Sequence, residues 1–316
     1  MHGVFALSFS PTELATTLAR GLLSFPLTFF GADGAFNEDG YRAHVAAQAR
    51  GGVSGLFAAG GMGEFFSLTL GEFGRVVRAA AQETPADLPL LAGVGYGTEM
   101  AIEFAKAAEA NGAEGLLVLP PYLVRSEQEG LRRHLTAICR SVGIGVIAYN
   151  RDNAVLAPET LEALADDCPN LIGLKDGVGD IELLTALRQR MGDRLIFIGG
   201  MPTAEVHASA AAAIGMTTYS SAIYNFAPEF ALRFFAALRA GRSEETGQLL
   251  RSFFLPYLAI RNRRAGYAVS IVKAGARIAG IDCGPVRLPL LDLTTDEEHQ
   301  LASLMQANGM PVAAPA

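Results

Sequence analysis

The sequence predicts an α/β protein, a (β/α)8 TIM barrel with a C-terminal helical extension. Eight short apolar runs alternate with helical stretches along the first 240 residues, and the strand signals stop after that point. The runs are apolar throughout, which is typical of parallel strands that are buried on both faces. Eight strands are enough for such a sheet to close, whereas an open doubly wound sheet usually has fewer strands and reverses direction in the middle.

The expected strands are spaced so that each is followed by room for one helix. They cover residues 21–30, 53–59, 88–94, 115–120, 143–149, 171–175, 194–199 and 217–221. The segments between them are rich in Ala, Leu, Glu and Arg, and in 98–111 the apolar residues recur at helical spacing. Thr98 is predicted to be the N-cap of that helix, and Gly112 is predicted to end it.

The chain is divided by these signals into a barrel and a smaller helical part. Residues 1–240 are predicted to form the barrel, with a short N-terminal helical segment, and residues 241–316 to form a helical extension packed on it. Breaks in the extension are expected near Gly266 and across 280–289. No Pro-, Ser- or Gly-rich linker marks a separate module, and a single unit of 316 residues is within the usual range for these barrels.

The composition excludes several classes of protein. A net charge of −7 and a pI near 5.3 argue against nucleic acid as a partner, because binding phosphates requires a basic patch. No apolar run reaches the 18 residues of a membrane span, and the N-terminus lacks the basic region of a signal peptide. The five scattered histidines predict no metal site. The three cysteines lack CxxC spacing and indicate reduced thiols in a cytoplasmic protein (Cys139, Cys168 and Cys283).

Lys175 is the first candidate for a catalytic residue. It closes the sixth expected strand, and active sites in these barrels lie at the C-terminal ends of strands. The chain has only three lysines against 22 arginines, so a lysine here suggests a task that arginine cannot perform. A buried lysine can lose its proton and attack a carbonyl group, whereas arginine stays protonated. The alternative is a lysine that forms an ion pair with Asp176 or another carboxylate.

Other strand ends supply candidate partners. Tyr149 closes the fifth strand, where its hydroxyl would suit proton transfer, although it could also be an aromatic residue bonded only to backbone. The glycine-rich turn 60–64 could hold a carboxylate on its N–H groups. Lys273 is the rival nucleophile, but it lies in the helical extension and is expected to pack or pair there. Lys106 is expected on the solvated face of a helix.

Together these residues resemble the dihydrodipicolinate synthase and N-acetylneuraminate lyase superfamily. Members carry a GxxGE turn after strand 2, a tyrosine after strand 5 and an imine-forming lysine in strand 6, which match Gly60–Glu64, Tyr149 and Lys175. The similarity covers about residues 20–300. It implies a lysine imine on Lys175 with Tyr149 as acid and base, a carboxylate held at Gly60, Gly61 and Met62, no cofactor, and a homo-oligomer, in this family a tetramer.

Longer stretches resemble one branch of that superfamily, whose members remove water and carbon dioxide from a keto sugar diacid. They are LFAAGGMGEFFSLT (56–69), PNLIGLKDGVGDIE (169–182) and IRNRRAGYAVSIVKAGARIAG (260–280). The resemblance implies that Ser221, Asn150 and Asn153 bind the hydroxyls or the far carboxylate of such a substrate. Because a strong arginine clamp would oppose loss of that carboxylate, Arg151 is expected to point to a structural partner such as Asp152.

The chain also departs from the superfamily pattern. Gly61 and Met62 stand where the synthases and lyases carry hydroxyl residues, and Leu123 stands where the synthases place a tyrosine shared between subunits. Their carboxylate-binding arginine falls near Ala154. These differences disfavour the synthase reaction and predict a self-contained active site. An aldolase that releases pyruvate is the alternative activity, and a non-catalytic protein that binds a keto acid is the alternative class.

Overall fold

The computed structural model describes residues 7–314 and contains the predicted barrel. Eight parallel strands follow one another around it in chain order. A bridge between Leu23 and Ser220 joins the last strand to the first and closes the sheet. The strands are β1 (Leu23–Ser24), β2 (Gly55–Ala58), β3 (Leu90–Val94), β4 (Gly115–Val118), β5 (Gly145–Asn150), β6 (Leu171–Asp176), β7 (Ile196–Gly199) and β8 (Thr218–Tyr219). Each lies within or next to its predicted run, although β1 is much shorter than 21–30. The start of the chain, which bears on the signal-peptide prediction, lies partly outside the described residues.

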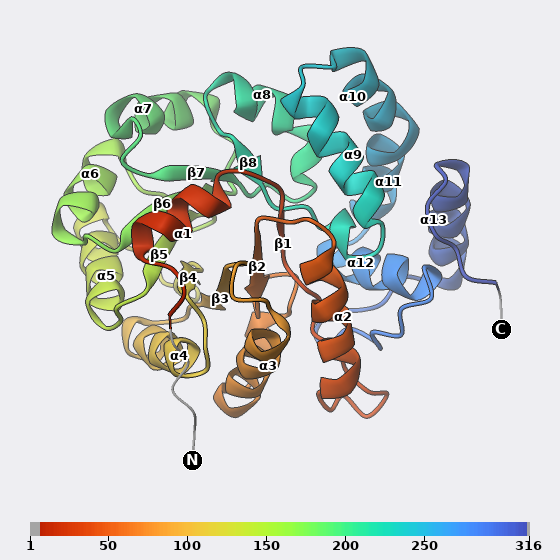
Figure 1. Ribbon diagram of the computed structural model, residues 1–316, viewed down its shortest axis with the longest axis horizontal. Helices are drawn as coiled ribbons and strands as arrows, with labels where there is room; N and C mark the ends of the chain where they lie inside the picture. Colours follow the sequence, from red (N-terminus) through yellow and green to blue (C-terminus); the bar gives the residue numbers. More distant parts are fainter. Residues whose placement is uncertain (1–6, 315–316) are drawn as a thin grey trace.

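A ring of helices surrounds the strands (Figure 1). The ring consists of α2 (Glu38–Arg50), α3 (Leu70–Glu83), α4 (Thr98–Ala110), α5 (Gln128–Arg140), α6 (Pro158–Asp167), α7 (Ile181–Met191), α8 (Ala208–Ala213) and α9 (Pro228–Arg239). Helix α4 ends before Gly112 as predicted, with Gly112 at φ 95°. The predicted N-cap was wrong: Gly97 caps α4, because the Thr98 hydroxyl instead bonds the His134 ring 2.9 Å away on α5.

The N-terminal end of the barrel is closed by helix α1 (Pro11–Leu18), the predicted short helical segment. Leu14 and Leu18 are its fully buried residues. Leu14 lies over Gly115 and Gly145, the first residues of two strands, where a Cβ would come within 2.8 Å of its side chain. Because this end is filled, only the C-terminal ends of the strands can border a cavity in the barrel.

Within residues 241–314 the C-terminal extension is mainly helical, with breaks where the glycines predict them. It contains α10 (Ser243–Leu249), a π-helical turn (Leu250–Phe254), α11 (Leu255–Arg261), α12 (Tyr267–Ile278) and α13 (Thr295–Ala307). Gly266 adopts φ 87° directly before α12, and an irregular segment follows that helix. No helix among residues 7–314 is long and apolar enough to cross a membrane. The division at residue 240 stays a prediction.

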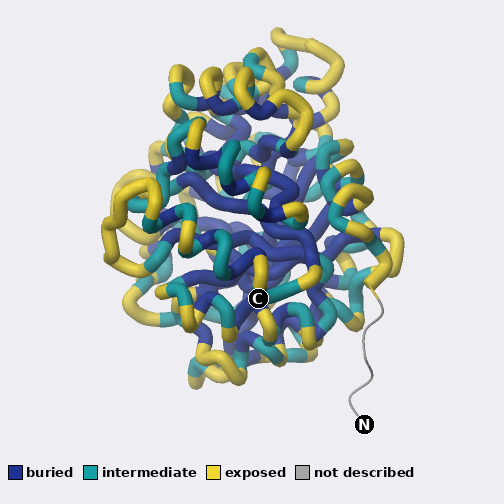
Figure 2. The backbone as a smooth tube through the Cα atoms, turned by 90° about the vertical axis from the view of Figure 1, so that its left-hand side faces the viewer, coloured by how far each residue is buried: buried dark blue, intermediate teal, exposed yellow. Residues whose placement is uncertain are grey.

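The strands form the buried centre of the molecule, and exposed residues gather on the outer turns (Figure 2). The extension is attached to this core by aromatic packing. Phe253 and Phe254 are fully buried, and both rings contact Phe230 of α9 at centroid distances of 5.1 and 5.7 Å. Burying such rings is worth about 2 kcal/mol each. The extension is therefore firmly joined to the last helix of the barrel.

Candidate active site

A cavity of about 880 Å³ opens at the C-terminal ends of the strands. Its walls come from the ends of β4, β5 and β6, from the segments that follow β1, β2, β7 and β8, and from the C-terminal extension. The polar residues that line it are Glu64, Ser67, Arg125, Tyr149, Arg151, Asp152, Asn153, Lys175, Thr203, Ser220, Ser221, Tyr257 and Arg261. Four of these side chains are basic (Arg125, Arg151, Lys175 and Arg261), so the cavity suits an anionic ligand of metabolite size.

Lys175 lies at the base of this cavity on β6, directly beside Tyr149 on β5 in the sheet register. Only 4% of its surface is exposed. Its amine lies 4.1 Å from the centre of the Tyr149 ring and 5.1 Å from that of Phe25. Among residues 7–314, no carboxylate comes within 4.0 Å of this amine. The amine is therefore surrounded by aromatic faces and has no ion-pair partner.

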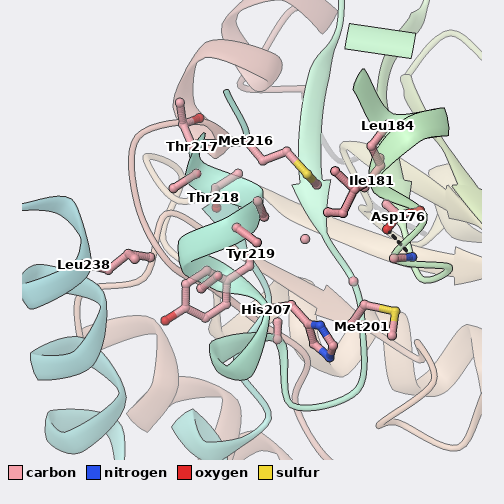
Figure 3. A pocket seen from close by; sticks show the side chains of 18 of the residues that line it. Asp176, Ile181, Leu184, Met201, His207, Met216, Thr217, Thr218, Tyr219 and Leu238 are labelled. Atoms are coloured by element: carbon pink, nitrogen blue, oxygen red, sulfur yellow. Dashed lines mark hydrogen bonds between the residues drawn. The ribbon is translucent and has the colours of Figure 1, made fainter. Parts of the chain in front are cut away.

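Asp176, the predicted alternative partner, points out of the barrel. Successive residues of a strand face opposite sides of the sheet, so Lys175 points inward and Asp176 outward. The Asp176 carboxylate accepts hydrogen bonds from the backbone of Val178 and Gly179 at 3.2 and 2.9 Å. Figure 3 shows it on the outer side of the sheet, bound to that turn. The interpretation of Lys175 as one half of an ion pair with Asp176 is therefore wrong.

Burial lowers the pKa of Lys175 below its ordinary value, and the positive charge of Arg151 adds to this shift. A lower pKa increases the fraction of neutral amine, which is the nucleophilic form. Gly200 leaves the space in which the amine lies, since a Cβ there would be 2.6 Å from its nitrogen. The site thus favours a neutral, unobstructed amine.

The Tyr149 hydroxyl lies in the same cavity and is polarised by cations. It donates to the Gly200 carbonyl at 2.9 Å and accepts from the Arg151 guanidinium at 3.3 Å. Burial alone would raise the pKa of Tyr149, but the charges of Lys175 and Arg151 outweigh it and lower that pKa. A tyrosine with a lowered pKa is better suited to exchanging protons near neutral pH.

The turn after β2 brings two of the three residues of the predicted carboxylate site to the cavity. Ala59 and Glu64 bound it with φ of 47° and 54°, a left-handed conformation that costs non-glycine residues about 1 kcal/mol or more. Gly61 and Met62 line the cavity, and within residues 7–314 their N–H groups have no acceptor. Gly60 does not line the cavity, because it packs under the Phe25 ring.

Glu64 holds this turn to the C-terminal extension. Its carboxylate lies 2.8 Å from the Lys273 amine on α12, and neither side chain is exposed. The same carboxylate accepts the backbone N–H of Arg287 at 2.9 Å, and Lys273 donates to the Pro285 carbonyl at 2.7 Å. Lys273 is therefore a buried structural ion pair, as predicted. Leu288 and its neighbours, which follow Arg287, form part of the cavity wall.

The other predicted ligands lie in different places. Ser221 lines the cavity, and its hydroxyl bonds the Glu205 carboxylate at 2.5 Å. Asn153 also lines it, but its amide nitrogen donates to the carbonyls of Pro121 and Val124 and so holds the loop after β4. Asn150 does not line the cavity: it is fully buried and accepts the backbone N–H of Leu156 at 3.0 Å. Asn150 is therefore placed to fix the chain after β5 rather than to contact a ligand.

Arg151 occupies a position that sequence reasoning predicted only in part. Its guanidinium contacts Asp152 at 3.1 Å, as expected, but this pair is largely exposed. It also bonds the Tyr149 hydroxyl and lines the cavity. Exposed ion pairs such as Arg151–Asp152 contribute about 0–1 kcal/mol to stability. The contact with Tyr149 is the one that bears on the chemistry.

Two site residues were not predicted because they come from elements far along the chain. Arg261, at the end of α11, reaches the cavity and donates to the Thr203 hydroxyl at 2.7 Å. Tyr257, one turn earlier, lines the same wall. Their spacing of four residues places both on one face of the helix, and this was the only signal in the sequence.

A second cavity, of about 180 Å³, lies on the outer side of the sheet. It lies between β7, β8 and helices α7, α8 and α9, and Figure 3 shows Met201, Met216 and Leu238 around it. Gly200 and Met201 border both cavities. Because Lys175 and Tyr149 line only the larger cavity, we assign the candidate active site to that one.

Known proteins share both the sequence pattern and the fold. The model of the dihydrodipicolinate synthetase family matches residues 18–308. The chain belongs to this family. A putative dihydrodipicolinate synthetase from Pseudomonas aeruginosa is 25% identical, with a TM-score of 0.83 over 91% of this chain and 99% of that one. A family member from E. coli K12, solved in complex with pyruvate, is 26% identical, with a TM-score of 0.81 over 91% and 97%.

Curated relatives of this family member are more similar still. A probable 5-dehydro-4-deoxyglucarate dehydratase from Bradyrhizobium sp. (strain ORS 278) is 55% identical over 97% of both chains. A protein of the same name from Pseudomonas syringae pv. tomato is 53% identical over 95% of this chain and 99% of its own. The resemblance to the decarboxylating branch, found from three stretches of sequence, thus extends along almost the whole chain.

Proposed function

We propose that this protein is a 5-dehydro-4-deoxyglucarate dehydratase that removes water and carbon dioxide through an imine on Lys175. The observation that carries the proposal is the Lys175 amine: it is buried, has no carboxylate partner, and lies in a cavity large enough for a six-carbon diacid. The names of the curated relatives support the choice of substrate. The product would be 2,5-dioxopentanoate.

The first half of the reaction is an elimination. The neutral amine of Lys175 attacks the keto carbon, and loss of water gives an iminium ion. This ion acidifies the neighbouring CH₂, and Tyr149, whose pKa is lowered by Lys175 and Arg151 against the effect of burial, is placed to exchange that proton. The resulting enamine expels the β-hydroxyl as water and leaves an unsaturated iminium ion.

The second half is a decarboxylation that uses the same electron sink. The unsaturated iminium ion extends conjugation by two carbons, so it accepts the electron pair released when the far carboxylate leaves as carbon dioxide. Protonation on carbon, tautomerisation and hydrolysis then release 2,5-dioxopentanoate and restore the amine. Because one iminium serves both steps, the sequence of steps requires no further cofactor.

The two substrate carboxylates would meet different surroundings. The keto-acid carboxylate fits the N–H groups of Gly61 and Met62, which are neutral donors. The far carboxylate fits the wall of Tyr257 and Arg261, beside Ser221. The Arg261 guanidinium is already shared with Thr203 and Asn262, at 2.7 and 2.9 Å, so it would hold a carboxylate less firmly than a free arginine clamp. Such weak binding agrees with a group that must leave.

Incubation with 5-dehydro-4-deoxyglucarate and borohydride tests the proposal. We expect mass spectrometry to find a reduced adduct on the peptide that contains Lys175, and turnover without borohydride to release carbon dioxide. Release of pyruvate would instead indicate the aldolase. An adduct on Lys273, or no adduct at all, would contradict the imine assignment.

We also propose a homotetramer in the cytoplasm. Apolar side chains gather beside the cavity mouth with 50–80% of their surfaces exposed, which supports contact with another subunit (Phe66, Tyr122, Leu123 and Val124). The three cysteines are free, which fits a reducing compartment. Light scattering would give the mass of the assembly. Mixing Lys175→Arg subunits with wild type should lower activity only in proportion, because Leu123 offers no shared catalytic group.

A further inference from the structure

Glu205 is a buried carboxyl group that the proposed reaction does not yet use. It lies in a short 3-10 turn (Ala204–Val206) after β7, and only 1% of its surface is exposed. Oε1 bonds the Ser221 hydroxyl, and Oε2 is buried without a partner among residues 7–314. No cation lies within ion-pair distance in that part of the chain. A carboxyl group placed in this way needs a reason beyond stability.

The groups around Glu205 come from β8, from the segment that follows it and from α11. Tyr219 on β8 and Tyr257 on α11 are the titratable neighbours, and burial raises the pKa of both, with the Glu205 charge contributing in each case. The Arg261 charge acts on Tyr257 rather than pairing with Glu205. On the remaining side lies Ser221, which lines the cavity that Glu205 itself does not reach. Ser221 is therefore the link between the buried carboxyl and a ligand.

We propose that Glu205 is a positioning residue that supplies a proton, through the Ser221 hydroxyl, to the hydroxyl group that leaves the substrate. The inference rests on the proposed function and deepens it, because it assigns the acid of the dehydration step. The geometry carries it: a buried carboxyl 2.5 Å from a hydroxyl that faces the same cavity as Lys175.

The enamine electron pair forms the new carbon–carbon double bond as the carbon–oxygen bond breaks. The departing oxygen takes the proton of the Ser221 hydroxyl and leaves as water. The Ser221 oxygen takes the proton of Glu205, which becomes a carboxylate and is protonated again from solvent before the next turnover. Without such a donor the leaving group would be hydroxide.

The protonation state of Glu205 fits this role. Burial raises its pKa to about 7, and the hydrogen bond from Ser221 opposes that rise. Below this pH the carboxyl is protonated and can donate. Above it the carboxylate can only accept, so the dehydration step should slow as pH rises through about 7.

Glu205→Gln separates proton supply from hydrogen bonding, since the amide can bond Ser221 but cannot transfer a proton. We expect kcat to fall about 10²- to 10⁴-fold, KM to change little, and the borohydride adduct on Lys175 to form as in wild type. The decline of kcat above pH about 7 should disappear. Glu297→Gln is the matched control, because Glu297 is a buried carboxylate that bonds Tyr267 at 2.7 Å in the extension.

Ser221→Ala provides a second variant, which tests the link even if Glu205→Gln does not fold. It should lower kcat and remove the same pH dependence, and adding Glu205→Gln to it should cost nothing more. A wild-type kcat and pH profile in Glu205→Gln, or an unchanged profile in Ser221→Ala, would overturn the relay. Failure of the proposed function is distinct: wild type itself would then release no carbon dioxide.

Discussion

Two lysines are buried in this protein, and their surroundings are opposite. Lys273 lies in the extension with its amine 2.8 Å from the Glu64 carboxylate and 2.7 Å from a backbone carbonyl. Lys175 lies in the barrel among aromatic rings, and no carboxylate among residues 7–314 comes within 4.0 Å of its amine. Burial lowers the pKa of both, but the Glu64 charge opposes that shift only at Lys273.

The difference shows how one side chain serves structure in one place and chemistry in another. A buried ammonium group with a close carboxylate and a carbonyl stays charged and joins two segments. A buried amine without a carboxylate is destabilised as a cation and is available as a nucleophile. Solvent exposure does not distinguish the two lysines, since both are nearly inaccessible. Their charged and polar partners distinguish them.

Replacing Lys175 should have the largest effect. Lys175→Arg keeps the positive charge but removes the nucleophile, so turnover should fall to background and the borohydride adduct should vanish while the fold persists. Activity and mass spectrometry measure these outcomes, and circular dichroism checks the fold. Lys106→Arg, on an exposed helical face, is the control and should leave both unchanged. Residual adduct formation in Lys175→Arg would show that another lysine forms the imine.

Tyr149→Phe separates the effect of the Tyr149 ring on Lys175 from that of the Tyr149 hydroxyl. The ring that packs on the amine is kept, so the adduct should still form. Loss of the hydroxyl should slow turnover about 10²- to 10⁴-fold, the usual contribution of a general acid or base. Single-turnover assays combined with trapping separate the two effects. An unchanged rate would reduce Tyr149 to a packing residue.

Lys273→Met should affect stability rather than chemistry. It leaves the Glu64 carboxylate buried without its partner, which typically destabilises a protein by 3–5 kcal/mol. We expect a lower midpoint in urea, with trapping on Lys175 retained below the transition. Lys273→Met combined with Glu64→Gln should recover part of the loss. Loss of the adduct in folded Lys273→Met would contradict the division of roles.

Much of this contrast could be predicted from the sequence, because it depends on local position. Lys175 and Tyr149 close apolar runs, and strand ends in a barrel meet at one face whatever the loops do. Lys273 falls in the helical extension, away from the strand ends, which predicted a structural role. The sequence left open which residues of β6 point into the barrel. In the structure Lys175 points inward and Asp176 outward, so the two do not form an ion pair.

Contacts between distant segments were not predictable in this way. Glu205 reaches the site only through Ser221, and Arg261 enters it because the extension folds back over the barrel. Both depend on the path of loops. The prediction for Asn150 was wrong for a local reason. Asn150 lies at the expected strand end, but successive side chains of a strand point to opposite faces, so its side chain contacts the chain that follows β5 and not the cavity.

Arg151→Gln tests the cation beside the reactive pair, with a smaller expected effect. Arg151 lowers the pKa of Tyr149, so its removal should raise that pKa and move any rate-limiting ionisation of Tyr149 to higher pH. We expect kcat/KM to fall by about tenfold or less, measured across pH. A loss above about 3 kcal/mol would indicate that Arg151 clamps a substrate carboxylate.

The smallest expected effect is the pH dependence of the free energy of unfolding that the buried Lys175 amine causes. Because its folded pKa lies below the unfolded value, the folded protein binds fewer protons than the unfolded chain between those two pKa values. Stability therefore rises with pH across that window, and the lowered pKa of Tyr149 acts in the same direction. Lys175→Met removes the burial penalty and should be more stable than wild type at neutral pH, with the difference shrinking toward pH 10. Urea titrations at several pH values measure this. Lys273→Met, in contrast, should be less stable than wild type at neutral pH. If both substitutions destabilise the protein, Lys175 has a stabilising partner and the two lysines do not differ as described.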